Sequence, residues 1–522
     1  MTQATIEPIT PQERIQTIDI IRGIALLGIL VINFTVDDGD VSPMQGRTGF
    51  GDQLVWWFVR LLMDDRFQTI YCFLFGLGFA IQLQRATERN TGFIFLFLRR
   101  MIVLYLIGVA LSIFTNGGYY VISYYAMVGV LLLLFMKVPM RFLPVIAVFL
   151  FLMVKTRGTI IQFKLESKTE VLTKPNVSID TTILDKYVGV FQNDLKQRVI
   201  IIRKADTLIG EGPGRRFVLT PLSDSHFIRK DFNLILAFKK DSIGQLNILD
   251  LKRRDGGTIS HSTRVKTDLQ EALNKQLAQR SGNNTITYKQ FIVKGANDAW
   301  RNHKNFSLKD FLWRNNSYPI GYILVVILLG VYAGRRIFFN DVSAKWTFIK
   351  NLMRWGLIVG GILITINIGF EAWNYVKGIK WETYPLVIRS IMKCCWDIGE
   401  ILMALGYVAG ITLLAEKINW KKRLSFFAAV GQLGLTNYSL HLFAYVLIFN
   451  KFSFCLGLYG KIGTLYRFIF ALVVYVLLYL FSRWWIKHFK YGPFEWLWRS
   501  LTYLKFQPMQ LKSPLKIEEK EI

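Results

Sequence analysis

The chain has 522 residues, of which 52% are hydrophobic and 15% aromatic, and its formal net charge is +28. Charged residues make up only 19%, against about 25% in soluble domains, so the composition excludes a soluble globular protein. The excess of Lys and Arg is typical of segments that flank membrane helices and attract anionic lipid headgroups. Because no RNA-binding or zinc-finger motif accompanies it, we expect a lipid bilayer and no nucleic acid as its partner.

Hydropathy predicts an all-α polytopic membrane protein with about ten transmembrane helices. Basic loops follow the second, fourth, sixth, eighth and tenth spans, so the positive-inside rule places both termini in the cytoplasm and the chain in a cytoplasmic (inner) membrane. Between the first two spans, residues 51–63 form an amphipathic segment that is expected to lie on the outer surface. The ten spans are expected near residues 17–36, 66–85, 93–115, 119–137, 140–156, 317–338, 347–370, 396–416, 424–450 and 465–488.

A polar stretch interrupts the spans after the fifth. Short apolar runs separated by Gly and Asp occupy residues 157–263 and predict a small antiparallel β-domain. Residues 264–312 are polar and are expected to form a helical connector. Span parity makes this whole insert, 157–312, extracytoplasmic. The predicted domains are membrane helices 1–5 over 1–156, the β-domain over 157–263, the connector over 264–312, membrane helices 6–10 over 313–506 and a cytoplasmic tail over 507–522.

The first span, within RIQTIDIIRGIALLGILVINFTV, carries a polar stripe. Asp19 and Arg22 lie near its first turns and Asn33 lies deep inside, and at 100° per residue all three project to one side. A charged side chain in a span costs a few kcal/mol unless it is paired or faces a polar cavity. The stripe is therefore either a structural ion pair or the edge of a buried site.

Two later spans carry isolated polar residues. In GQLGLTNYSLHLFAYVLIF, His441 lies one turn after Asn437 on the same helix face. A buried histidine beside an amide can act as a general base, or it can join two helices through a hydrogen bond. Glu400 in the eighth span is expected either to face the bundle interior, where it pairs with an arginine or binds a cation, or to mark the outer helix end.

The segment YGPFEWLWRSLTY, residues 491–503, follows the last span. Glu495 and Arg499 are four residues apart on a predicted short helix, and Trp496 suits the headgroup layer. This pattern predicts an interfacial anchor with a surface ion pair, with a ligand contact as the alternative. The four cysteines form no CxxC motif, so we expect neither a disulfide framework nor a metal site.

Several landmarks occur in an order that resembles the YeiB-like membrane proteins, whose C-terminal half defines domain of unknown function 418. The landmarks are RIQTIDIIRGIALLGILVIN, FLFGLGFAIQLQRA, LRRMIVLYLIG, YYAMVGVLLLLF, GQLGLTNYSLHL and GPFEWLWRSLTY. The first-helix motif is similar to that of a wider set, the transmembrane acyltransferases, which include heparan-α-glucosaminide N-acetyltransferase. This resemblance implies acyl transfer from a cytoplasmic donor to an acceptor on the far side, through a residue buried in the membrane.

The chain departs from the family pattern at three positions. Leu111 and Tyr120 stand where the YeiB-like proteins often have His and Asp, and His441 stands where they usually have Gln. If the reaction needs a base, the resemblance implies that this chain supplies it from another position.

The insert has a resemblance of its own. LDKYVGVFQ, FVLTPLSDSHF and LILAFKKDSIGQLNIL are similar to domain of unknown function 3471 over roughly residues 180–253, a resemblance that implies a β-barrel-like module. That module has no established chemistry, so the resemblance implies binding or positioning.

These observations lead to a first functional hypothesis: acyl transfer to an extracytoplasmic glycan or lipid, with acyl-CoA as the donor. Asp19 and Arg22 then shape the cytoplasmic mouth, where arginine binds donor phosphates, and His441 activates the acceptor. Asn33, Asn437 and Glu400 are the other predicted channel residues. A transporter or lipid flippase that uses the same stripe is one alternative, and a non-enzymatic membrane platform that presents the β-domain is another.

Overall fold

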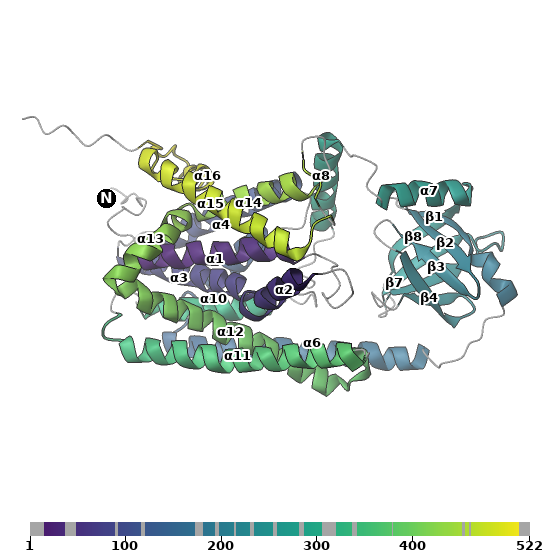
Figure 1. Cartoon of the computed structure of the whole chain (residues 1–522), viewed down its shortest axis with the longest axis horizontal. Coiled ribbons are helices and arrows are strands. Elements are labelled where there is room, and N and C mark those ends of the chain that lie inside the picture. The colour runs from purple at the N-terminus through teal and green to yellow at the C-terminus, as the bar shows by residue number, and fades with distance from the viewer. Residues whose placement is uncertain are drawn as a thin grey trace, which may run out of the picture. The chain divides into compact units, whose positions relative to one another are not determined.

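The structure is a computed structural model, and the chain divides into two compact units (Figure 1). One unit comprises Met1–Thr156 and Thr287–Ile522 and is helical, and the other, Arg157–Ile286, contains the strands. The boundary falls within one long helix, α6 (Leu143–Leu172). The described residues are 15–36, 49–88, 92–115, 121–172, 181–193, 198–212, 216–229, 234–253, 258–280, 287–304, 320–336, 342–377, 379, 381–450, 455–458 and 461–510.

Apolar helices dominate the first unit, and this confirms the predicted helical membrane class. In the described part of the chain, 7 helical stretches are long and apolar enough to cross a membrane. They are α1 (Gln16–Thr35), α2 with α3 (Phe50–Leu62 and Arg66–Glu88), α4 (Phe93–Phe114), the stretch Met140–Ile160 at the start of α6, α11 (Trp346–Lys377), α12 (Leu386–Glu416) and α15 (Thr464–His488). Shorter apolar helices occupy the other predicted spans, and these are α5 (Val121–Leu131), α10 (Ile320–Arg335) and α14 (Gly434–Phe449).

Glycines set how closely the central helices approach. A Cβ atom on Gly76 of α3 would lie 2.0 Å from the carbonyl oxygen of Ile327 in α10. At the start of α1, a Cβ atom on Gly431 would lie 1.9 Å from the carbonyl oxygen of Asp19. Only glycine permits this backbone-to-backbone approach, which lets membrane helices gain van der Waals contact in the absence of a hydrophobic driving force.

The predicted ninth span, 424–450, is two helices. α13 (Ile418–Gln432) ends before Leu433, whose φ of −103° and ψ of 40° leave the helical region, and α14 begins at Gly434. α13 crosses the end of the bundle at which α1 begins, which we call the near end (Figure 1). Its exposed basic residues explain why it does not continue the span, since a charged helix face is costly in lipid. These residues are Lys421, Lys422 and Arg423.

Short amphipathic helices cover the bundle elsewhere. We call the end of the bundle at which α1 ends the far end. α2 lies there and packs on α15 (Figure 1). α8 (Tyr288–Lys304) packs on α4, with Gly295 against the carbonyl oxygen of Ile113. The last helix, α16 (Pro493–Tyr503), packs on α4 and α14. α12 also begins earlier than the predicted residue 396.

The second unit confirms the predicted antiparallel β-domain as a closed eight-stranded barrel. Each strand pairs with its neighbour in the sequence, and β1 pairs with β8 to close the sheet. Closure leaves no free sheet edge for aggregation. The strands are β1 (Gly189–Asn193), β2 (Arg198–Lys204), β3 (Thr207–Glu211), β4 (Arg216–Ser223), β5 (His226–Arg229), β6 (Leu234–Lys239), β7 (Ile248–Arg253) and β8 (Thr258–Val265).

Aromatic rings fill the barrel. Tyr187, Phe191, Phe227 and Phe238 contact one another with ring centroids 4.9 to 5.6 Å apart. Edge-to-face contacts of this kind add to the free energy gained from burying the rings. Outside the barrel, α7 (Leu269–Arg280) packs Ala272 onto β1 and β2. Both α7 and α8 lie within the segment predicted to be a helical connector.

Candidate active site

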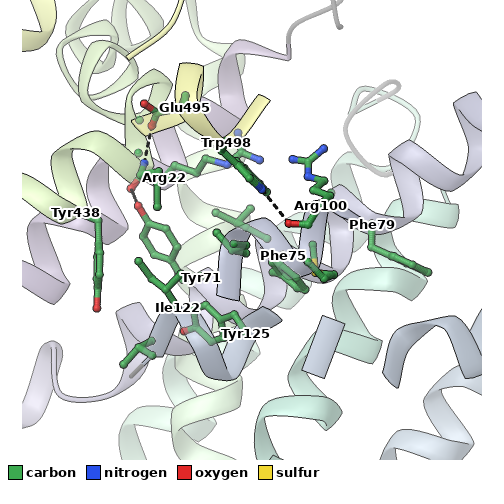
Figure 2. A pocket seen from close by; sticks show the side chains of 18 of the residues that line it. Arg22, Tyr71, Phe75, Phe79, Arg100, Ile122, Tyr125, Tyr438, Glu495 and Trp498 are labelled. Carbon is green, nitrogen blue, oxygen red and sulfur yellow. Dashed lines mark hydrogen bonds between the residues drawn. The ribbon is translucent and has the colours of Figure 1, made fainter. Parts of the chain in front are cut away.

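A cavity of about 290 Å³ lies inside the helical unit. Its wall is built by α1, α3, α4, α5, the end of α13, the start of α14 and α16 (Figure 2). The lining residues are Arg22, Ile29, Asn33, Gln68, Tyr71, Leu74, Phe75, Gly78, Phe79, Gln82, Phe97, Arg100, Met101, Leu104, Val121, Ile122, Tyr125, Gly431, Gln432, Gly434, Leu435, Tyr438, Glu495, Trp498 and Arg499.

Three arginines from three helices line the near end of this cavity. They are Arg22 of α1, Arg100 of α4 and Arg499 of α16. The guanidinium carbon of Arg100 lies 4.2 Å from the ring centroid of Trp498, and the Trp498 indole nitrogen donates to the Arg100 carbonyl oxygen at 2.9 Å (Figure 2). Cation–π stacking and a hydrogen bond from Arg100 Nη1 to Gln82 Oε1 at 2.8 Å fix the Arg100 side chain, while its other N–H groups remain suited to bind an anion.

The cavity extends through most of the bundle. On α3 its lining runs from Gln68 to Gln82, which is about 21 Å at 1.5 Å per residue. On α1 it runs from Arg22 to Asn33, about 16 Å. Apolar side chains make most of the wall between these ends, so the cavity suits a molecule with an anionic head and a slender, less polar arm.

Asn33 and His441 meet at the far part of the cavity. The Asn33 Nδ2 atom lies 3.0 Å from the His441 Nε2 atom, and this hydrogen bond joins α1 to α14. Asn33 lines the cavity, whereas His441 is fully buried and stands behind Asn33 and Tyr438. The Tyr438 and His441 rings make an edge-to-face contact at 4.8 Å. His441, predicted as the catalytic base, therefore reaches the cavity only through its neighbours.

The predicted stripe on α1 is divided between two environments. Arg22 and Asn33 line the cavity, while Asp19 is buried at the near end of α1. Asp19 and Arg22 form the ion pair that the sequence suggested, with 3.4 Å between Arg22 Nη1 and Asp19 Oδ1. The stripe is thus both a structural ion pair and the edge of a buried site.

Asn437 lies outside the cavity. Its side-chain nitrogen donates to the Val430 carbonyl oxygen at 2.9 Å and to the Ser482 hydroxyl at 2.8 Å. These bonds hold the end of α13 and the side of α15 against α14. In the structure the Asn437 side chain makes interhelix hydrogen bonds and does not line this cavity.

Glu495 departs from its predicted role in a surface ion pair. Its Oε1 atom accepts hydrogen bonds from the Leu435 N–H at 2.7 Å and the Thr436 N–H at 3.0 Å, at the N-terminus of α14. The Thr436 hydroxyl donates to Oε2. A carboxylate satisfies the otherwise unpaired N–H groups of a helix start and complements its positive dipole. Burial is the main cause that raises the pKa of Glu495, and these hydrogen bonds oppose it.

The rest of the C-terminal motif fixes α16. Trp496 donates from its indole nitrogen to the Gln507 carbonyl oxygen at 2.7 Å and stacks on Phe506. The guanidinium carbon of Arg499 lies 4.7 Å from the Tyr491 ring centroid. Arg499 also lines the cavity, so the ligand-contact alternative for this motif fits better than the surface anchor.

Glu400 is absent from the wall of this cavity. It is buried in the middle of α12, where Tyr322 of α10 donates a hydrogen bond to its Oε2 atom at 3.3 Å. It belongs to a separate cluster of charged residues around the start of α3.

Sequence reasoning misses several lining residues. Arg100 has the pattern of an ordinary basic flanking residue, Gln68 and Tyr71 belong to no motif, and Gln82 lies in the landmark FLFGLGFAIQLQRA without being singled out there. The sequence does contain a signal that could have identified the residues of α3. One face of this helix carries polar side chains at spacings of three or four, and its residues are Gln68, Tyr71, Phe75, Gly78 and Gln82.

Comparison with known proteins adds family context. Residues 333–505 match the family described as protein of unknown function (DUF418). Residues 14–191, which contain most of the cavity wall, match the family described as heparan-alpha-glucosaminide N-acetyltransferase, catalytic. No solved structure matches the chain significantly.

Curated relatives agree with the family matches. The chain is 24% identical over 528 residues to the uncharacterized protein YxaH of Bacillus subtilis, covering 98% of this chain and 99% of the relative. It is 35% identical over 133 residues to an uncharacterized 39.9 kDa protein of Bacillus acidopullulyticus, covering 26% of this chain and 37% of the relative. It is 28% identical over 156 residues to the uncharacterized protein YeiB of Escherichia coli, covering 30% of this chain and 38% of the relative. The chain is therefore a membrane protein similar to YeiB and YxaH, with one region that matches DUF418 and another that matches an acetyltransferase catalytic region.

Proposed function

We propose that this protein transfers an acyl group from an acyl-CoA donor, bound in the cavity, to a hydroxyl or amine of an envelope glycan or lipid. The arginine-lined near end of the cavity is the observation that carries the proposal. Arg22, Arg100 and Arg499 supply the charge and the donor geometry that phosphate groups require. The similarity of residues 14–191 to an N-acetyltransferase catalytic region supports the same reaction class.

In this proposal the near end faces the cytoplasm, in accord with the predicted orientation. The phosphates of the donor bind the three arginines, and the pantetheine arm follows the apolar wall toward Asn33. The cavity runs about 16 Å along α1 between Arg22 and Asn33, a distance suited to an extended arm of this kind. The thioester carbonyl then lies at the far part of the cavity, where an acceptor approaches from the other side.

The reaction is a nucleophilic substitution at the thioester carbonyl. The acceptor oxygen or nitrogen forms a bond to the carbonyl carbon, the carbon–sulfur bond breaks, and the proton lost by the acceptor passes to the departing thiolate. Asn33 can stabilise the developing oxyanion with its second N–H or orient the acceptor with its carbonyl oxygen. His441, which stands behind Asn33, is a positioning residue in this arrangement because it holds the amide through the 3.0 Å hydrogen bond.

The test uses the purified full-length protein. Acetyl-CoA and longer acyl-CoA donors are added, and the thermal shift and the release of free CoA thiol with an envelope extract as acceptor are measured. We expect the donor to stabilise the wild-type protein against thermal unfolding. In Arg100→Ala the apparent affinity for the donor should fall at least tenfold. Arg423→Ala, which removes an exposed arginine of α13 outside the cavity, is the matched control and keeps full affinity.

Two results would contradict the proposal. One is a donor affinity that Arg100→Ala leaves unchanged. The other is accumulation of an unmodified solute in proteoliposomes without any acyl product, which would support transport. Mass spectrometry of envelope glycans and lipids from a deletion strain then identifies the acceptor through the acyl mass that is lost.

A further inference from the structure

A second buried polar centre lies at the far end of the bundle, around the turn between α2 and α3. Arg66 is fully buried, and Asp64, Tyr322 and Glu400 are each at most 6% exposed. Charged groups at this depth are costly unless they are paired, and they usually serve a function. The lining of the arginine cavity includes none of these residues.

The two arginines of this centre are used differently. Arg60 forms an ion pair with Asp64 and a second one with Glu371, whose oxygens lie 3.2 and 3.3 Å from its Nη2 atom. Arg66 donates instead to backbone oxygens, through Nη1 to the carbonyls of Arg60 at 3.0 Å and Asp64 at 2.7 Å. Both guanidinium groups lie over the ring of Trp396 in α12, at 4.3 Å for Arg60 and 5.6 Å for Arg66.

Buried polar atoms on two facing helices have no hydrogen-bond partner among the residues that the structure describes. On α3 these are the Nε and Nη2 atoms of Arg66, which form one edge of its guanidinium group, and on α12 it is the Oε1 atom of Glu400. The two side chains are close enough to interact electrostatically. The free edge of an arginine is the geometry that binds a carboxylate through two parallel hydrogen bonds. Arg66 and Glu400 therefore hold the groups for an ion pair without making its hydrogen bonds.

A second carboxyl group faces Glu400. Asp65, in the turn before α3, is close enough to interact electrostatically with Glu400, and both carboxyl groups interact with Arg66. Two neighbouring carboxylates repel one another when both are ionised, so a buried pair of this kind favours one shared proton. Arg60 is already paired with Asp64 and Glu371, which leaves Arg66, of these two arginines, as the cation for both remaining carboxyl groups.

We propose that Asp65 and Glu400 form a proton-binding site of this membrane protein, which holds one shared proton and exchanges it with water on the side of Asp65. Asp65 is the partly exposed member of the pair, so it provides the exit. When the proton leaves to water, the pair gains one negative charge. The Glu400 carboxylate then turns to the unpartnered edge of Arg66, and a two-fold hydrogen-bonded ion pair between α12 and α3 replaces the shared proton.

Polar groups of several neighbouring helices surround the pair. α2 contributes Arg60, α11 contributes Glu371, and α12 contributes Tyr407, whose hydroxyl donates to the Leu62 carbonyl oxygen at 2.9 Å. On α6, Lys155 pairs with Asp397 of α12 and also interacts with Glu400. These partners are already paired, so Arg66 is the cation available to Glu400 after deprotonation.

A hydrogen-bond chain links the site to the cavity-lining helix. Tyr322 of α10 donates to Glu400 Oε2 at 3.3 Å and shares a 3.2 Å hydrogen bond with the Thr69 hydroxyl of α3. Thr69 adjoins Gln68, which lines the far part of the cavity. Release of the proton therefore changes the contacts that fix the start of α3, and through it the far part of the cavity.

The test is an infrared titration of the full-length protein in lipid nanodiscs, followed through the carbonyl stretch of protonated carboxylic acid. We expect the wild-type protein to show such a band near neutral pH, to shift it in heavy water and to lose it as the pH rises. Glu400→Gln and Asp65→Asn should each remove the band. Asn is suited to position 65 because its φ of 54° lies in the left-handed region that Asn tolerates. Glu371→Gln, which changes an exposed carboxylate, should retain the band.

Size-exclusion elution and thermal unfolding establish that each variant is folded. A wild-type protein without the band, or a band that persists in folded Glu400→Gln, would overturn the proposal. If Asp65→Asn does not fold, Arg66→Lys decides the outcome. Lysine keeps the charge but lacks the two-fold edge, so the titration midpoint should rise by at least half a pH unit, and an unchanged midpoint would overturn the proposal.

Discussion

The amide of Asn33 and the imidazole of His441 are joined at 3.0 Å although the two residues are 408 positions apart in the sequence. The bond crosses from α1 to α14 and places a cavity-lining amide against a buried ring. The two ends of the chain thus contribute jointly to one wall of the cavity.

Substitution of His441 tests the positioning role. His441→Leu should lower kcat for acyl transfer at least tenfold and leave the donor KM within twofold, because the arginines that bind the donor are untouched. His441→Gln should restore most of the activity, since a glutamine can bond to Asn33. If His441 acted as a general base, His441→Gln would also be inactive. Its residual rate would then no longer decrease at acidic pH.

Substitution of Glu495 tests the cap on α14. Glu495→Ala removes the acceptor of two backbone N–H groups and should lower the free energy of unfolding by about 1–2 kcal/mol. Glu495→Gln keeps an acceptor oxygen and should lose less. Thermal unfolding of the purified protein measures both, with Glu416→Ala at the exposed end of α12 as the control. An equal loss in the glutamine and alanine variants would contradict the capping role.

The same carboxyl group predicts a pH dependence. Burial raises the pKa of Glu495, so the folded state holds the proton more tightly than the unfolded chain. This contribution to stability is fully present below the unfolded pKa and is lost as the pH rises through the folded value. The stability of the wild-type protein minus that of Glu495→Gln should therefore decline as the pH rises from about 4.3. A difference that increases over this range would contradict the prediction.

Close helix packing at Gly76 predicts a size limit. In Gly76→Ala the new methyl group would meet the Ile327 carbonyl oxygen at 2.0 Å, so α3 and α10 must separate. Overpacking of this kind should cost about 1–3 kcal/mol, measured as a lower midpoint of thermal unfolding in nanodiscs. Gly361→Ala on α11 is the matched control because no atom lies within 4 Å of its added Cβ. Equal midpoints for the two variants would show that the helix contact is not tight.

An ionic cluster on the barrel predicts acid sensitivity of β7 and β8. Asp250 is buried, which by itself raises its pKa, but hydrogen bonds from Lys239 and His261, each 2.6 Å long, lower the pKa overall. A lowered carboxylate pKa stabilises the fold above the unfolded value of about 3.9 and loses this effect as the pH falls through the folded value. The hydrogen-exchange protection factors of β7 and β8, which correct for the pH dependence of the intrinsic rate, should fall over that range in the wild-type protein. Asp250→Asn should exchange faster at neutral pH and show a smaller acid effect.

The sequence predicts the parts of the fold that depend on local pattern. Long apolar helices and hairpin spacing in the insert lead to the helical membrane class and the β-domain, because period and length report on burial. The break at Leu433 is missed because the apolar residues of α13 and α14 form one continuous run. The exposed basic start of α13 and the close contact of Gly431 with Asp19 hold α13 at the near end, and that contact is a tertiary feature that the run does not show.

The sequence predicts part of the candidate site, because some of its residues interrupt an apolar pattern. Arg22 and Asn33 stand out as polar residues in an apolar span, and both line the cavity. Arg100 does not stand out, since Arg99 beside it suggests an ordinary basic flank. Glu495 resembles a partner of Arg499 because both lie on one helix, and only the fold brings the start of α14 to it.

No residue between Tyr125 and Gly431 contributes to the cavity wall among the residues that the structure describes. The cavity wall is thus assembled from the two outer stretches of the polypeptide, while the intervening stretch contains the helices that support α3 and the barrel, which is a compact unit of its own. Changes confined to the barrel can therefore leave the cavity wall unchanged. Sequence divergence in the barrel would then report on what the barrel binds and not on what occupies the cavity.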